Sequence, residues 1–298
     1  MAACEAKGLT AIAAGPVREA IESLEELPAS IGVVQKALET IGDTLCSNEE
    51  LQYILSGDPG ATADVLRVAN SPYFGVSAQI RNLSMAIAVM GHARLRTLLR
   101  HLIVSKLLEK LTVDSVLAGQ ARDRALAVGV ACHEIAKRLR RRDADDLLTG
   151  GLLYNVGELA LMSELPGPYE KVMGLARTMS QRVAEIAVFG VDSLTVSRWL
   201  LRAWDFPEVF VAASGYWNCP HHPAVPPSLG SFVHSVHLGV CLAERWLAKR
   251  GPEVVRRDLR GPEATWISEH PGLLADVYSS MENGVDKLSQ SLLHVRAA

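Results

Sequence analysis

The sequence predicts an all-α protein. Its strong apolar patterns recur at helical spacing, and no alternating run of strand length stands between turn signals. Hydrophobic residues make up 49% of the chain but aromatic residues only 5%, so Leu, Val, Ala and Ile supply most of the expected core. Side chains of this kind suit helices that pack against one another. A chain of 298 residues is long enough to bury a substantial core in this way.

The composition also argues against some classes of binding partner and indicates a cellular compartment. A net charge of -3 argues against nucleic-acid binding, for which we expect clustered Lys and Arg. Charged residues or His interrupt every apolar segment before the roughly 20 residues that a membrane helix needs, so we expect no membrane partner. The five cysteines are scattered and form no CxxC pair, which is typical of reduced thiols. We therefore expect a soluble, cytoplasmic protein.

The first helices are marked by prolines and capping residues. We expect residues 1–15 to form a mobile tail and Pro16 to open a short helix. Ser30 is a candidate N-cap for the next helix. Ser47, followed by Glu50 three residues later, forms a capping box in front of a third helix.

The next helix has a strong start and a shaped end. Asp58 and Pro59 predict its first turn, because the carboxylate can accept free amide hydrogens there and proline gives up a donor that has no partner. Asn70, Ser71 and Gly75 then concentrate turn chemistry around a Tyr-Phe pair. We expect cap and turn roles for these five residues.

The remaining elements follow from the same helical period. Gly91 permits a break in the apolar segment that begins at Asn82. His133 lies on the apolar face of a long helix, where we expect a hydrogen-bonded core residue. We interpret the cationic run over residues 137–142 as the solvated end of that helix, and a boundary near Gly119 is expected to separate two helical subdomains. Further helices are expected over residues 122–142, 145–162, 168–178, 180–189, 192–204, 207–215, 229–250 and 273–293.

The stretch DPGATADVLRVANSPYFG, followed by MAIAVMGHARLRTLL, resembles the first half of an HDOD domain. The resemblance covers roughly Leu27 to His222. It implies an HD-domain-like, multi-helix fold similar to that of the HD phosphohydrolases, in a bacterial signalling protein without the full set of metal ligands. It also implies an HDOD domain over residues 16–222, with an N-terminal helical subdomain to about residue 119 and an HD-like part after it. Residues 223–298 would form C-terminal helices that complete or extend the HD-like part.

An HD hydrolase binds one or two metal ions through histidines and aspartates, and the metal lowers the pKa of a bound water. Carried over by the resemblance, the first histidine falls at Arg124, and the His-Asp pair falls at Tyr154 and Asn155 in GLLYNVGELAL, which looks like the family's GLLHDIGKL. Arginine stays protonated, tyrosine is a poor ligand at neutral pH and asparagine lacks the carboxylate charge. We therefore expect no catalytic residue, no metal and no cofactor. The matching positions, which we name the vestigial cleft, are Arg124, Tyr154, Asn155, Trp217 and Asn218 for the later histidine pair, and Val240 for the final aspartate.

A rival metal site lies later in the chain, where five potential ligands fall within nineteen residues. They are Cys219, His221, His222, His234 and His237. His234 and His237, at i and i+3, can share one helix face. The spacing matches no closed zinc motif and no carboxylate lies between these residues, so we expect capping and core histidines here.

The sequence contains no Gly-rich phosphate loop, GxSxG elbow or supported carboxylate pair. The leading hypothesis is therefore a non-catalytic, HDOD-type signalling module that binds a protein partner or a small effector. The alternative is a metal-dependent phosphohydrolase of the HD type that acts on a nucleotide, with the histidine cluster in place of the lost ligands. A third hypothesis is an inactive domain that binds a nucleotide in the vestigial cleft. The oligomeric state stays open.

Overall fold

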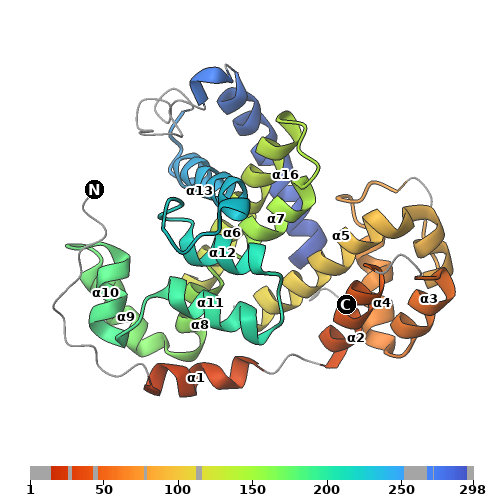
Figure 1. The fold of residues 1–298 in the computed structure, drawn as a ribbon, viewed down its shortest axis with the longest axis horizontal. Coiled ribbons are helices and arrows are strands. Elements are labelled where there is room, and N and C mark those ends of the chain that lie inside the picture. The colour runs from red at the N-terminus through yellow and green to blue at the C-terminus, as the bar shows by residue number, and fades with distance from the viewer. Residues whose placement is uncertain are drawn as a thin grey trace. The chain divides into compact units, whose positions relative to one another are not determined.

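The computed structural model describes residues 15–25, 29–42, 46–76, 79–111, 116–251, 267–270 and 272–293. The predicted tail falls almost wholly outside these residues. Every regular element within them is a helix, which confirms the all-α prediction (Figure 1). None of the described helices is long and apolar enough to cross a membrane. The helices are α1 (Gly15–Glu25), α2 (Ala29–Thr40), α3 (Asn48–Ser56), α4 (Pro59–Ala69), α5 (Leu83–Leu111), α6 (Val116–Arg138), α7 (Ala144–Leu152), α8 (Val156–Glu164), α9 (Pro166–Leu175), α10 (Gln181–Phe189), α11 (Ser193–Ala203), α12 (Glu208–Tyr216), α13 (Pro227–Leu247) and α16 (Leu273–Leu293).

The chain forms two compact units. Unit 1 comprises Met1–Glu26, Leu111–Ala125 and Leu153–His237, and unit 2 comprises Leu27–Lys110, Leu126–Leu152 and Leu238–Ala298. The boundary that the sequence suggested near Gly119 falls inside α6. The predicted division into an HDOD domain and C-terminal helices stays a prediction.

Unit 1 is built around the contact between α8 and α11. A side chain at Gly157 in α8 would collide with the Ser193 carbonyl of α11, so only glycine allows the two helices to approach this closely. The hydroxyl of Ser197 then accepts a hydrogen bond from the Gly157 amide at 2.9 Å. Helix α1 packs on both α8 and α11, and α9 lies beside α10 (Figure 1). The buried indole of Trp204 donates to the carbonyl of Leu24, just before the end of α1, at 2.8 Å.

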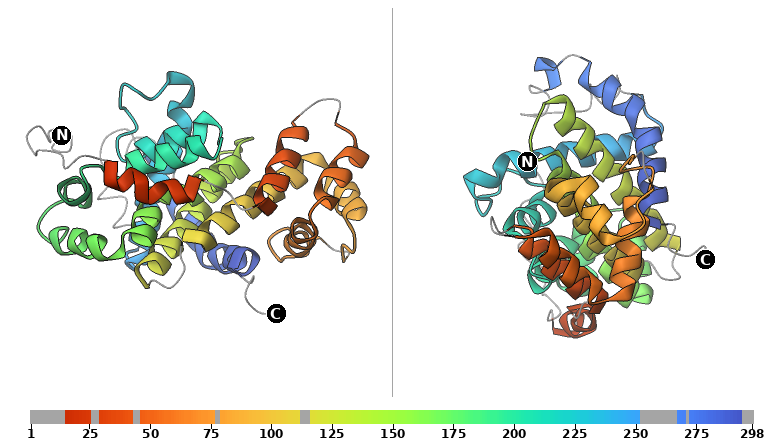
Figure 2. Two further views of the ribbon diagram at one scale, coloured as in Figure 1. Left: turned by 90° about the horizontal axis from the view of Figure 1, so that it is seen from below. Right: turned by 90° about the vertical axis from the view of Figure 1, so that its right-hand side faces the viewer.

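In unit 2, α2, α3 and α4 lie side by side (Figure 2). The Asp58 carboxylate accepts a hydrogen bond from the Ala61 amide at 2.6 Å, and Pro59 is the first residue of α4. At the other end of α4, the Asn70 amide group donates to the carbonyls of Leu66 and Ile80 and accepts from the Ile80 amide. Asn70 therefore ties the end of α4 to the segment in front of α5.

The turn after α4 is compact. Ser71 donates its backbone amide to Val68, and its carbonyl accepts from Phe74. Gly75 has a φ of 55°, which is the left-handed region that favours glycine. The structure thus places the five residues of the Asp58–Gly75 motif in cap and turn positions.

Glycine contacts also hold the second half of unit 2 together. A side chain at Gly151 in α7 would lie 2.7 Å from the Gly129 Cα of α6, so these helices meet backbone to backbone. A Cβ on Gly284 of α16 would lie 2.7 Å from Val130 of α6, which places α16 directly against the same helix. Gly91 breaks the regular geometry of α5, with a φ of 66°.

The prediction of one continuous helix over residues 145–162 is wrong, because the structure contains two helices there, α7 and α8. Residues 153–155 interrupt it, although the apolar pattern continues through them. The Leu153 carbonyl accepts a hydrogen bond from the Ser214 hydroxyl at 2.9 Å, and the Tyr154 ring packs against Trp217. Contacts with residues some 60 positions away therefore override the local helical preference.

Candidate functional site

Three residues of the vestigial cleft come together around the start of α8. Arg124 extends from α6, while Tyr154 and Asn155 occupy the break in front of α8. Glu158 lies in the first turn of α8, where its charge is favourable next to the positive end of the helix dipole. All four residues belong to unit 1.

The centre of this site is an ion pair between Arg124 and Glu158. Nη2 of Arg124 donates to Oε1 of Glu158 at 2.6 Å, and only 9% of the Glu158 side chain is exposed. Burial alone would lower the pKa of the Arg124 guanidinium, but the charge of Glu158 and the hydrogen bonds to Glu158 and Tyr154 raise it instead. Arg124 therefore stays protonated, at the position where the family resemblance implies the first metal ligand.

Further polar groups bind the same carboxylate. The Asn155 amide donates to Oε2 of Glu158 at 3.3 Å and to the Ala121 carbonyl at 3.0 Å. Gln181 donates to Oε1 of Glu158 at 3.0 Å. With Arg124, these donors use both oxygens of Glu158, so the carboxylate is held in one orientation.

A second buried layer lies behind Glu158. The hydroxyl of Tyr169 is 3.5 Å from Glu158 and 3.4 Å from Glu185. Burial, together with both carboxylates, raises the pKa of Tyr169, which therefore stays a neutral phenol. Burial also raises the pKa of Glu185, whose second oxygen accepts the Ser193 amide at 2.8 Å.

Tyr154 connects the ion pair to Trp217. The two rings meet edge to face, with their centroids 5.5 Å apart. Two buried polar atoms at this site, Nε1 of Trp217 and Oδ1 of Asn155, have no hydrogen-bond partner among the described residues. Asn218 is exposed beyond the end of α12. Val240 is buried in α13 and belongs to unit 2.

These residues do not fit a divalent metal ion. Where the family implies a histidine nitrogen, the structure places a guanidinium that forms a close pair with a buried carboxylate. A metal here would face the charge of Arg124 at short range and would have to compete for Glu158. No group of three or more His, Cys, Asp or Glu suited to a metal occurs in the described parts of the chain.

The residues of the rival cluster have separate partners. His221 and His234 meet ring to ring at 4.4 Å. His222 stacks on Tyr216 at 4.9 Å, and Nδ1 of His222 accepts the Ala224 amide. Nδ1 of His237 lies 2.8 Å from the Trp217 carbonyl oxygen. Cys219 is half-buried in the same loop. Among these five residues, His221 and His234 are thus in direct ring contact.

Sequence reasoning missed the residue on which the site depends. Glu158 was passed over because it sits within the apolar run GELALM, whereas its Arg124 partner lies 34 positions earlier. An acidic residue at a core position of a helix is the signal that could have identified it, since such groups are seldom buried without a partner.

Comparisons with known proteins match this fold. The HDOD domain family model matches residues 27–220. A crystal structure of an HDOD domain protein of unknown function from Geobacter sulfurreducens has a TM-score of 0.72 at 20% identity, covering 94% of this chain and 98% of that chain. A candidate phosphohydrolase from Shewanella amazonensis SB2B has a TM-score of 0.68 at 20% identity, covering 95% and 99%.

Two further similar proteins are longer than the region that matches this chain. A candidate signal transduction protein from Marinobacter aquaeolei VT8 has a TM-score of 0.60 at 18% identity, covering 95% of this chain and 68% of that one. An uncharacterized protein from Treponema pallidum (strain Nichols) is 25% identical over 215 residues, which cover 70% of this chain. That match spans 40% of the Treponema protein, so the chain corresponds to less than half of this relative.

Proposed function

Because the chain belongs to the HDOD family, we propose that it is a non-catalytic signalling module that binds a protein partner or a small effector. The observation that carries this proposal is the pair between Arg124 and Glu158 at 2.6 Å. It fills the place of the first metal ligand with a cation and its counter-ion. The helix that carries Glu158 meets α11 through a close glycine contact at Gly157, and we propose that this scaffold no longer supports metal chemistry.

The charge balance supports a structural role for this pair. Glu158 is buried and hydrogen-bonded on both oxygens, so removing it from Arg124 to coordinate a metal would leave the guanidinium without its counter-ion. A hydrolytic metal needs several deprotonated ligands in fixed geometry to generate a hydroxide. Tyr154 and Asn155 supply neither a nitrogen ligand nor a charge.

Two neighbours bear on the wider role. The Marinobacter protein is described as a candidate signal transduction protein, which supports a bacterial signalling role. The Shewanella protein is described as a candidate phosphohydrolase, so a metal-dependent phosphohydrolase acting on a nucleotide is the second candidate. At 18% and 20% identity, both likenesses support the fold, and the choice between the two functions depends on the residues of this chain.

Turnover assays separate the two candidates. The purified protein, supplied with manganese, iron or zinc, should hydrolyse neither phosphomonoesters nor cyclic dinucleotides. The double variant Tyr154→His/Asn155→Asp should also be inactive, because Arg124 still holds the first ligand position and Val240 the last. Metal-dependent turnover by the unmodified protein, abolished by a chelator, would establish the phosphohydrolase instead.

A further inference from the structure

Unit 2 contains a cavity of about 730 Å³, and none of its lining residues belongs to the Arg124–Glu158 site. It is lined by the turn after α4 and by helices α5, α6, α7 and α16. Every residue that lines the cavity belongs to unit 2. The volume lies in the range of about 300–1,000 Å³ that is typical of small-molecule sites.

The described residues that line this cavity carry an excess of positive charge. The lining contains four basic side chains, Arg94, Lys137, Arg138 and Lys287, and two carboxylates, Glu134 and Asp145. The cations come from α5, α6 and α16, so their charges converge from three helices. Lys137 and Arg138 belong to the run that the sequence suggested was merely a solvated helix end.

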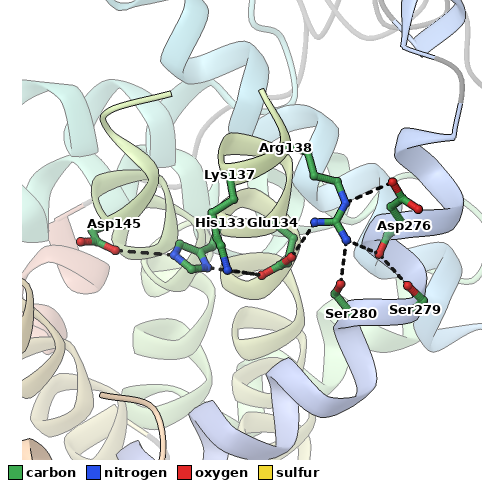
Figure 3. Close-up of polar contacts among 8 residues, drawn as sticks. All are labelled: His133, Glu134, Lys137, Arg138, Asp145, Asp276, Ser279 and Ser280. Carbon is green, nitrogen blue, oxygen red and sulfur yellow. Dashed lines mark hydrogen bonds and ion pairs between the residues drawn. The ribbon is translucent and has the colours of Figure 1, made fainter. Parts of the chain in front are cut away.

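The carboxylate of Glu134 forms ion pairs with neighbouring side chains of α6 (Figure 3). Its carboxylate lies 3.1 Å from Nη1 of Arg138, 3.5 Å from Nζ of Lys137 and 3.7 Å from Nδ1 of His133. Contact with His133 and the charges of Lys137 and Arg138 outweigh burial and lower the pKa of Glu134 to about 2. Glu134 therefore stays ionised and orders the cations around it, and the lining keeps a net positive charge because its four Lys and Arg residues outnumber its two carboxylates.

Asp145 is also engaged. Its Oδ2 accepts the Thr97 hydroxyl at 2.8 Å, and its Oδ1 lies 3.6 Å from Nε2 of His133. Burial alone would lower the pKa of His133, but Asp145 and Glu134 raise it, which favours a protonated imidazole between the two carboxylates. A protonated His133 thus adds a positive charge between Glu134 and Asp145.

Arg138 is fixed by contacts across the cavity wall. Its Nη2 donates to the Asp276 carbonyl at 3.1 Å and to the Ser280 hydroxyl at 3.0 Å, both on α16 (Figure 3). Asp276 itself does not line the cavity. Lys287, two turns further along α16, is exposed and forms no hydrogen bond or ion pair with any described residue. Its ammonium group is available to a ligand.

The turn after α4 contributes an aromatic surface to the cavity. Tyr73 and Phe74 line the cavity, with ring centroids 5.1 Å apart, and the Tyr73 ring also lies 5.1 Å from that of His101. His101 is fully buried behind them. The cavity therefore has an aromatic wall as well as cationic groups, and flat rings stack readily on such a wall.

We propose that this cavity binds a phosphate-bearing small molecule with an aromatic ring, which is the chemistry of a nucleotide. The phosphates contact Lys137 and Lys287, and the ring packs on Tyr73. Charge-assisted contacts from Lys and Arg are the usual means of holding phosphate oxygens. Binding here is separate from the Arg124–Glu158 pair, which belongs to unit 1, and it holds whether or not the protein is catalytic.

Isothermal titration of the full chain with ATP and with GTP tests this proposal. We expect saturable binding of at least one nucleotide that weakens as salt is raised, because exposed cations contribute to it. Pyrophosphate and adenosine, which carry the two halves of the chemistry, should each bind more weakly. Lys137→Met and Lys287→Met should each weaken nucleotide binding roughly tenfold, the loss expected for one charged contact.

Lys171→Met is the matched control, since Lys171 is an exposed lysine on α9 that does not line the cavity. It changes the net charge by the same amount and should leave the affinity unchanged. Absence of saturable binding of both nucleotides at millimolar concentrations would overturn the proposal. An equal effect of all three lysine substitutions would also overturn it, and pyrophosphate that binds as tightly as ATP would refute the ring contact.

Discussion

Arg124 illustrates how one substitution changes what a site can hold. Its guanidinium takes a position where the family resemblance implies a neutral nitrogen, and Glu158 balances its charge from within the core. A buried pair of this kind need not stabilise the fold more than apolar packing does, but breaking it is costly because one charge is left without a partner. The pair therefore resists loss of either member.

Arg124→Met should lower the free energy of unfolding by about 3 kcal/mol, since the nearly buried Glu158 carboxyl would lose its ion-pair partner. The double variant Arg124→Met/Glu158→Gln should recover part of this loss, because neither charge is then left unpaired. Urea denaturation measures both. Arg202→Met is the control: Arg202 pairs with Glu208 at 2.9 Å, with both side chains more than half exposed, so its loss should cost less than about 1 kcal/mol. Equal losses from Arg124→Met and Arg202→Met would argue against a coupled buried pair.

His101 is a second residue whose charge state follows from its surroundings. Neither ring nitrogen has a hydrogen-bond partner among the described residues, and Tyr73 and Phe74 cover the ring. Burial is the largest influence and lowers the pKa of His101 from 6.5 to about 4, despite the opposing charge of Asp145. The folded protein therefore keeps this histidine neutral.

The consequence is a defined dependence of stability on pH. The unfolded chain binds a proton at His101 below about pH 6.5 and the folded chain only near pH 4, so this stabilisation is present above pH 6.5 and is lost as the pH falls towards 4. Relative to His101→Leu, the unmodified protein should lose up to about 1.4 kcal/mol more per pH unit in this window. Thermal or urea unfolding at several pH values measures the difference. Parallel pH profiles for the two proteins would show that His101 is not held neutral by the fold.

At the scale of elements, close contact between α8 and α11 positions Tyr154, Asn155 and Glu158. Gly157→Ala should destabilise unit 1 by about 3 kcal/mol, because the added methyl group meets the Ser193 carbonyl and forces the helices apart. Gly174→Ala is the control, since its Cβ would meet no atom within contact distance and alanine is the better helix former. Its stability in a denaturation experiment should be unchanged or higher. If both substitutions behaved alike, the close approach of α8 and α11 would not be the determining contact.

Helices with a clear period and a cap were the most predictable elements. The limits of α16, Leu273–Leu293, were predicted from its apolar period, and the Asp58 carboxylate caps α4 as its position in front of Pro59 indicated. These signals are local, so the sequence displays them. The break between α7 and α8 was missed because its causes, Ser214 and Trp217, lie far along the chain. Lys137 and Arg138 do lie in the last turn of α6, but the contacts of Arg138 with α16 were not predicted, because Asp276 and Ser280 are about 140 positions away.

At the scale of the whole molecule, the chain matches the HDOD family over residues 27–220. The family resemblance implies metal ligands at positions where this chain carries Arg124, Tyr154 and Asn155. Unit 1 carries the Arg124–Glu158 pair, and unit 2 carries the cationic cavity beside Tyr73. A regulatory module needs a site that recognises a signal and does not need one that consumes it. On this account, the cavity in unit 2 recognises the signal, and the Arg124–Glu158 pair in unit 1 stands in place of a catalytic metal site.

The metal content of the protein tests the central claim most directly. Protein purified without an affinity tag, dialysed and analysed by inductively coupled plasma mass spectrometry should contain no stoichiometric manganese, iron or zinc, because Arg124 holds Glu158 and repels a cation at the family's metal position. One transition metal per chain that survives dialysis, with phosphatase turnover that a chelator abolishes, would contradict the account and identify a phosphohydrolase.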